Sequence, residues 1–179
     1  MTENNLTMDE RLRRPSASNI ERLVYCPASF KRSLEYGIKE EKSFAAEKGT
    51  KIHDALSGKL SMELLSEQER RIALKIGDMV NTLTQKLFIS NDFNSDRFIV
   101  IREERIWYSK TWIFNDDIPT QLFSAKPDLA IYDNDSNDLL IVEYKTGASY
   151  VERPYYNYQL RAQAAAITQY LTENFAKKI

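Results

Sequence analysis

Two carboxylates and a lysine are spaced so that one end of a β-hairpin could bring them together. Asp128 precedes one apolar run, and a second apolar run leads to Glu143 and Lys145 after a turn rich in Asn, Asp and Ser. Such a pattern predicts a hairpin. If Asp133 pairs with Asp138, the same register sets Asp128 opposite Glu143 on one face. Because side chains alternate along a strand, Glu143 and Lys145 share that face.

These charged groups would converge at the end of a strand, 139–142, that is apolar on both faces and therefore suited to a covered position, where charge is costly. Hard divalent cations such as Mg²⁺ and Mn²⁺ prefer carboxylate oxygens as ligands. A neighbouring lysine can orient the attacking water or offset charge on a phosphorane. The grouping fits metal-assisted phosphodiester hydrolysis, and the alternative is a surface hairpin with ordinary salt bridges.

Other residue types that carry chemistry are scarce. His53, the only histidine, sits beside an apolar row in a helical pattern. Taken alone, it reads as a surface or capping residue. The only cysteine, Cys26, leaves no internal disulfide and no four-cysteine zinc or iron–sulfur site from this chain alone. One further carboxylate, Glu104, either faces the site or is a solvated strand residue.

Helices and strands must position these residues. Capping boxes at Ser18–Glu21 and Ser66–Glu69 open two of the helices. The predicted helices cover 18–25, 28–36, 44–60, a stretch beginning at 66 and one following 158, and the predicted strands cover 98–112, 121–125 and the hairpin. The long helix from 66 is expected to bury Ile72, Ile76, Met79, Val80, Leu83 and Leu87. The last helix is expected to bury Leu160, Ala164, Ile167 and Leu171, with Gln163 on a flank.

Composition and charge bound the class of protein. The 179 residues predict a flexible N-terminal arm over 1–15 and a single domain over 16–179. The sequence shows no secretory signal and no apolar run of membrane-spanning length, so we expect a cytoplasmic protein without membrane contact. A net charge of -1 argues against coating of nucleic acid by bulk electrostatics. Any nucleic-acid binding must therefore be local, in a groove.

Four motifs follow one another along the chain. They are Pro15–Ser18 leading to Cys26-Pro27, Gly49-Thr50-Lys51-Ile52-His53, Pro127-Asp128 with Glu143-Tyr144-Lys145-Thr146-Gly147, and Tyr158-Gln159-Leu160. Their order and spacing over about 15–175 resemble the PD-(D/E)XK nuclease superfamily. Within it they resemble the RecB-like exonucleases, which include phage recombination nucleases and CRISPR-adaptation exonucleases. The resemblance implies an α/β (α+β) fold with a restriction-endonuclease-like core, in which helices flank a mixed central sheet with an antiparallel active-site hairpin.

The resemblance also implies roles for individual residues. His53, Asp128 and Glu143 are implied as ligands of Mg²⁺ or Mn²⁺, with the backbone carbonyl of Tyr144 completing the coordination shell. Lys145 is implied as the catalytic lysine, acting together with the two carboxylates.

Substrate contacts are expected after the hairpin. The resemblance implies that Gln159 contacts the substrate or orients the lysine. Tyr156 and Tyr158 could stack on unpaired bases while Arg161 contacts the DNA backbone. The alternative for the tyrosines is packing of their connector onto the core.

The chain also departs from the family pattern. Gln163 stands where the glutamine motif often carries a tyrosine. Many RecB-like members hold an iron–sulfur cluster through a cysteine like Cys26 and three more near the C-terminus, and this chain lacks those three. No complete cluster is therefore expected from this chain. Either Cys26 is a buried core residue of a cluster-free branch, or the sequence is a C-terminally truncated piece of a longer protein.

The function expected from these observations is that of a Mg²⁺- or Mn²⁺-dependent deoxyribonuclease. The resemblance favours an exonuclease in recombination, repair or phage DNA processing, in the cytoplasm of a bacterium or a phage-infected host. Its partners would be DNA, as a single strand or a duplex end, and a recombination or replication protein, with the oligomeric state left open. The alternative is a catalytically inactive nuclease-fold module that binds DNA or a protein. Retention of His53, Asp128, Glu143 and Lys145 together argues against that alternative.

Overall fold

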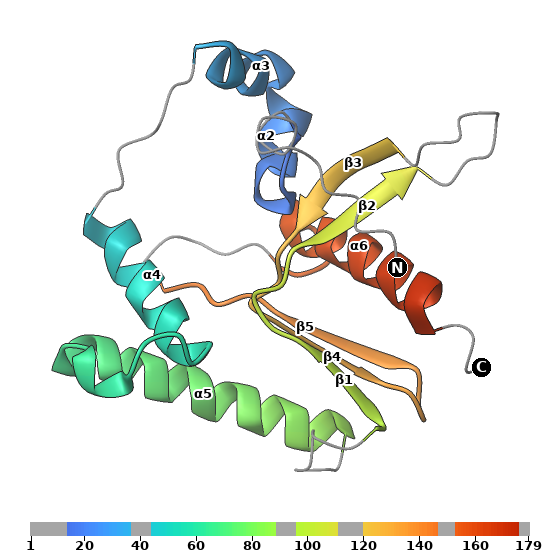
Figure 1. Ribbon diagram of the computed structural model, residues 1–179. Coiled ribbons are helices and arrows are strands. Elements are labelled where there is room, and N and C mark those ends of the chain that lie inside the picture. The colour runs from blue at the N-terminus through green and yellow to red at the C-terminus, as the bar shows by residue number, and fades with distance from the viewer. Residues whose placement is uncertain (1–13, 37–43, 89–95, 111–119, 147–152, 176–179) are drawn as a thin grey trace. The chain divides into compact units, whose positions relative to one another are not determined.

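The computed structural model describes residues 14–36, 44–88, 96–110, 120–146 and 153–175 (Figure 1). Its helices are η1 (Ala17–Asn19), α2 (Ile20–Tyr25), α3 (Pro27–Glu35), α4 (Phe44–Leu56), η2 (Met62–Leu64), α5 (Glu67–Phe88) and α6 (Tyr158–Phe175). Its strands are β1 (Phe98–Ile101), β2 (Ile106–Lys110), β3 (Thr120–Ala125), β4 (Leu129–Asp133) and β5 (Asp138–Val142). Helices and antiparallel sheets confirm the predicted α/β fold class. None of the described helices combines the length and apolar character that crossing a membrane requires.

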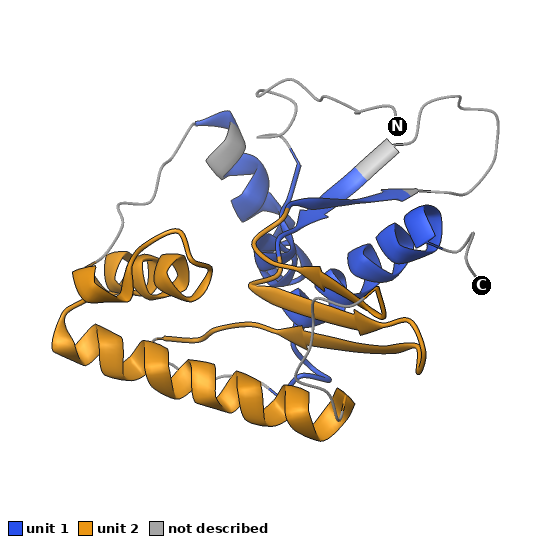
Figure 2. Cartoon of the chain, turned by 60° about the horizontal axis from the view of Figure 1, so that its bottom comes forward, with its two compact units in different colours: residues 1–40, 105–126, 152–179 blue, residues 41–104, 127–151 orange. Residues whose placement is uncertain are grey.

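The chain divides into two compact units, each assembled from segments far apart in the sequence (Figure 2). Unit 1 comprises residues 1–40, 105–126 and 152–179, and unit 2 comprises residues 41–104 and 127–151. The expected single domain over 16–179 stays a prediction, and so does the flexible arm, most of which lies outside the described residues.

The sheet of unit 2 has the strand order β1-β4-β5, so β4 is its central strand. Both ladders are antiparallel. The hairpin pairs Asp133 with Asp138 and Leu129 with Val142, which confirms the predicted register within the ladder. Asp128 and Glu143 lie one residue beyond its last pair, so their pairing stays a prediction. Its four-residue turn closes with Asn137 at φ 61, a left-handed conformation that Asn tolerates better than most residues.

An ion pair holds the turn end of this sheet. Arg97 donates to both carboxylate oxygens of Asp133, at 2.8 and 2.5 Å, and the aspartate is only 1% exposed. The backbone N–H of Asp135 and the hydroxyl of Ser136 also donate to it. The Arg97 guanidinium and these hydrogen bonds hold the pKa of Asp133 far below its ordinary value, against the effect of burial.

Helices α4 and α5 supply the rest of the unit 2 core. Ile52 and Ala55 of α4 pack with Ala73 of α5 in one cluster. Phe88, near the end of α5, packs with Phe98 and other residues of the sheet in a second cluster. Because both ends of α5 are tied to neighbours in this way, the helix forms a scaffold along which α4 and the sheet are placed (Figure 1).

The capping box at Ser66 is confirmed, because the Ser66 N–H donates to Glu69 Oε2 at 2.8 Å and the Glu69 N–H donates to Ser66 Oγ at 3.3 Å. The predicted buried face of α5 is partly wrong. Met79, Leu83 and Leu87 are exposed, and the buried face is instead formed by Glu69, Ala73, Thr84 and Phe88. The apolar side of this helix is wider than the face that packs against the core. Hydrophobic periodicity alone therefore could not predict which of its apolar residues are buried.

Unit 1 is organised around α6. This helix contacts β2, β3, η1 and α2, and β2 pairs antiparallel with β3 through a register shift at Tyr108 and Ser109. Gln169 of α6 spans the irregular point, since its amide exchanges hydrogen bonds with the backbone of Ser109 at 2.9 and 3.1 Å. A parallel bridge joins Ser16 to Ser124. Gln163 is fully buried rather than on a flank of α6, a correction to the prediction.

Three further predictions were wrong. The first capping box is Ser16 with Asn19, at η1, rather than Ser18 with Glu21. The strand expected over 98–112 is two strands, because Glu103 turns the chain at φ 52 and its N–H donates to the carbonyl of Pro127 at 3.0 Å. Cys26 is exposed, not buried, because it lies at the junction between α2 and α3.

Candidate metal site

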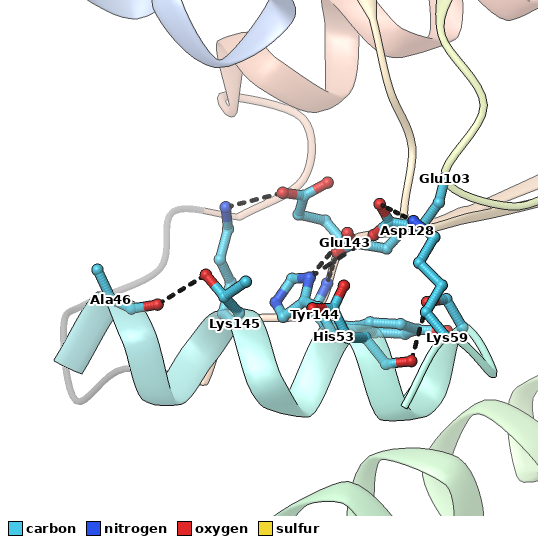
Figure 3. A network of polar contacts seen from close by, with 11 residues as sticks. Ala46, His53, Lys59, Glu103, Asp128, Glu143, Tyr144 and Lys145 are labelled. Atoms are coloured by element: carbon cyan, nitrogen blue, oxygen red, sulfur yellow. Dashed lines mark hydrogen bonds and ion pairs between the residues drawn. The ribbon is translucent and has the colours of Figure 1, made fainter. Parts of the chain in front are cut away.

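The hairpin and α4 bring the candidate residues together within unit 2 (Figure 3). His53 lies in the last turn of α4, whose inner residue Ile52 is buried in the core. Asp128 directly precedes β4 and Glu143 directly follows β5, so the antiparallel register sets both at the same end of the hairpin. Leu129 and Val142, the hairpin residues next to these carboxylates, pack in the cluster that holds Phe88 and Phe98, and this packing limits where the carboxylates can lie.

Three side chains form a group with ligand atoms suited to a metal ion. His53, Glu103 and Asp128 each offer one such atom, and all three atoms lie within 4.8 Å of one another. His53 Nδ1 is 3.0 Å from Asp128 Oδ1 and 4.0 Å from Glu103 Oε1. The side chains are 24%, 8% and 11% exposed for His53, Asp128 and Glu103. One imidazole nitrogen and two carboxylates, largely shielded yet reachable, fit a hard or borderline divalent cation that keeps several waters.

Asp128 is held from two directions. Its Oδ1 faces His53, and its Oδ2 accepts the backbone N–H of Tyr144 at 2.5 Å. The Tyr144 ring also lies edge-on to the imidazole, with centroids 5.6 Å apart. The hydrogen bond from the Tyr144 N–H ties the residue before β4 to the segment that follows β5. It also keeps the other carboxylate oxygen, Oδ1, facing His53.

The carboxylates raise the pKa of His53. The largest cause is its hydrogen bond to Asp128, burial opposes it, and the charges of Asp128, Glu103 and Glu143 add to it. The surroundings thus favour a positive charge at this point. A divalent cation can satisfy the same demand once the ring has released its proton.

Glu143 and Lys145 lie beside this group. Lys145 Nζ is 3.2 Å from Glu143 Oε1, the glutamate is 11% exposed, and the lysine is 40% exposed (Figure 3). The lysine therefore offsets a nearly buried carboxylate while its ammonium group still reaches solvent. That position suits a group that must meet a phosphate or its attacking water.

Glu103 was missed by sequence reasoning, which considered Glu104 instead. Glu104 is exposed. The backbone turn at Glu103 directs the side chain of Glu103 itself toward His53. Glu103 is also contacted by Lys59, whose Nζ lies 3.3 Å from Oε2 (Figure 3). The one available signal was the charged run 102–105 between two apolar segments, which marks an interruption as readily as a solvated strand.

The predicted substrate residues all belong to unit 1. Gln159 and Tyr158 begin α6, and the Tyr158 ring meets Tyr25 edge-on at 6.0 Å and the Arg161 guanidinium at 5.8 Å. Tyr156 is exposed. Their part in substrate binding stays a prediction, as does the carbonyl of Tyr144 as a ligand.

An α/β fold that presents histidine and carboxylate ligands at one end of a hairpin is suited to a metal-dependent hydrolase of phosphodiesters. The family model of the PD-(D/E)XK nuclease superfamily matches residues 14–177. The chain belongs to this superfamily, and its fold is consistent with the restriction-endonuclease-like core. No curated protein and no solved structure is significantly similar to the chain. Membership supports nuclease activity with a divalent metal, and His53, Glu103 and Asp128 form a group that could bind one.

Proposed function

We propose that this protein is a Mg²⁺- or Mn²⁺-dependent deoxyribonuclease that hydrolyses phosphodiester bonds from a DNA end. One observation carries the proposal: the ligand atoms of His53, Glu103 and Asp128 gather at the end of the hairpin beside Lys145. A salt-bridged surface hairpin would not need carboxylates as buried as these, because burial of unused charge is costly. The superfamily match points to the same chemistry.

Each residue of the site has a distinct role. His53, Glu103 and Asp128 hold the metal, and Glu143 and the carbonyl of Tyr144 complete its shell. When bound, the metal supplies Lewis acidity toward the phosphate oxygen and lowers the pKa of a coordinated water. Tyr144 keeps Asp128 oriented through its N–H, so that the carboxylate need not reorganise when the substrate arrives.

Lys145 acts on the phosphate and the attacking water. Three carboxylates around the site would repel a DNA phosphate, and the lysine ammonium, held at 3.2 Å from Glu143, offsets part of that charge. In the same position it can hold a water by hydrogen bonding or neutralise charge that develops on the phosphorane. Its loss should therefore slow the chemical step more than it weakens metal binding.

DNA is held by residues of unit 1 in this proposal. Gln159 contacts the substrate, Tyr156 and Tyr158 stack on bases, and Arg161 contacts the backbone. The exposure of Tyr156 and the guanidinium lying over the Tyr158 ring support this reading, because aromatic rings and arginine together suit unpaired nucleotides. We further propose an exonuclease of the RecB-like branch that serves recombination, repair or phage DNA processing with a protein partner, in the cytoplasm.

The test is degradation of end-labelled DNA. Purified protein is incubated with single-stranded or duplex DNA in Mg²⁺, Mn²⁺ or EDTA, beside Asp128→Ala and Lys145→Ala. We expect shortening of the labelled strand by the unmodified protein in metal only, and little or none by either variant. Equal degradation by all three proteins would reject the site. Metal-dependent DNA binding without degradation by any of them would favour the inactive binding module.

A further inference from the structure

Helix α4 approaches the segment after β5 closely at one point. An ideal Cβ built on Gly49 would lie 2.9 Å from Thr146 Oγ1, a distance that real Cβ atoms essentially never show. Among the described residues, no other heavy atom outside the glycine's own helix and neighbours comes within 4 Å of that position. The closeness of the two segments here therefore depends on a missing methyl group at residue 49 and on one side-chain atom at residue 146.

Both contacting residues adjoin the metal site. Gly49 lies four residues before His53 on α4, and residues at this spacing share one face of a helix. Thr146 directly follows Lys145, on the segment whose Tyr144 N–H holds Asp128. The contact thus joins the helix that carries the histidine to the segment that carries Glu143 and the lysine.

We propose that Gly49 and Thr146 are positioning residues that set the spacing between His53 and the Glu143–Lys145 segment. The inference rests on the proposed nuclease function. Glycine weakens a helix interior relative to alanine, so its presence here needs a compensating reason. Close approach of the two segments supplies one.

A methyl group at residue 49 must displace something. Thr146 is β-branched and has few side-chain rotamers to escape into, so the backbone of its segment moves. Misplacement by about 1 Å can cost 100-fold in rate. We expect Gly49→Ala to lower kcat by about 10- to 100-fold. Its Tm should change by no more than about 4 °C, because alanine favours the helix while the contact opposes it.

The experiment measures Gly49→Ala in three backgrounds: the unmodified Thr146, Thr146→Ala and Thr146→Val. Alanine at position 146 removes the γ atom that blocks the methyl group, whereas valine keeps the volume and discards only the hydroxyl. In the Thr146→Ala background, we expect Gly49→Ala to change kcat by less than about twofold. In the Thr146→Val background, we expect Gly49→Ala to keep its full effect on kcat, because a purely steric effect depends on volume alone. An equal loss in all three backgrounds, or no loss beside the unmodified Thr146, would overturn the proposal.

A second readout does not depend on activity. His53 is the only histidine, so its imidazole gives one set of NMR signals, which the nearby Tyr144 ring makes sensitive to position. The chemical shifts of these signals should change in Gly49→Ala relative to the unmodified protein. In the double variant Gly49→Ala/Thr146→Ala, they should be close to those of Thr146→Ala alone. Unshifted signals in Gly49→Ala would count against the proposal even if activity fell. If the unmodified protein cleaves no DNA, the nuclease function fails, and the NMR comparison still decides the spacing.

Discussion

Among the residues of the site, Glu103 has the least expected position. It occupies a left-handed backbone conformation that costs free energy for a residue other than glycine. Its N–H donates to the backbone carbonyl of Pro127. Its carboxylate lies between Lys59 and His53. The surrounding bonds therefore hold in place a conformation that directs a carboxylate into the metal group.

Glu103 and Glu104 provide a matched pair of substitutions. Glu103→Gln should lower Mn²⁺ affinity by about 10-fold or more, the loss that removal of even a supporting partner of a metal ligand causes. Glu104→Gln should change the affinity by less than about twofold, because that side chain is exposed and outside the group of ligands. Calorimetric titration of Mn²⁺ into each protein measures both values. A larger effect at residue 104 than at residue 103 would remove Glu103 from the site.

At the scale of elements, the hairpin is fixed at both ends by different means. The far end is closed by the buried carboxylate of Asp133 and its bonds to Arg97. The site end is tied through the Tyr144 N–H to Asp128. A hairpin held at both ends cannot slip in register, and a slip of one residue would turn each of its side chains to the opposite face.

The hairpin should make stability depend on pH. The folded pKa of Asp133 lies below its ordinary value of 3.8, so its contribution is present above that value and is lost as pH falls toward the folded pKa. The difference in unfolding free energy between the unmodified protein and Asp133→Asn should therefore shrink from about pH 5 downward. Urea unfolding between pH 7 and pH 3 measures it. Asp135→Asn is the control, since that carboxylate is 70% exposed. A difference that stays constant with pH would contradict this account.

Sequence patterns predicted the elements whose signals are local. The hairpin register followed from a four-residue polar turn between two apolar runs, and the Ser66 capping box followed from spacing. Contacts between distant residues were not visible in the same way. The break at Glu103 depends on a bond to Pro127, and the exposure of Met79 depends on which row of α5 meets the core.

The same division applies to the candidate site. His53 and Asp128 were predicted from motifs, and the structure sets them 3.0 Å apart. Glu103 was missed because the direction of its side chain depends on a left-handed backbone conformation, which its residue type does not predict. Gly49 was noted as costly in a helix, but its reason, the approach of Thr146, required coordinates.

On the scale of the whole molecule, the family match includes segments of both units, whereas the group of metal ligands lies entirely in unit 2. Metal binding by the full chain can therefore be tested without DNA. A net charge of -1 also means that affinity for DNA must come from local groups rather than from the overall charge.

The most direct test of a metal-dependent nuclease at this site is calorimetric titration of Mn²⁺ into the unmodified protein and into Asp128→Asn, with Asp138→Asn as an exposed control on the same hairpin. We predict saturable binding by the unmodified protein and the control, in the concentration range where Mn²⁺ activates DNA cleavage. Asp128→Asn should bind at least about 100-fold more weakly, beyond what loss of a supporting partner costs. Equal Mn²⁺ affinity in all three proteins would contradict the account.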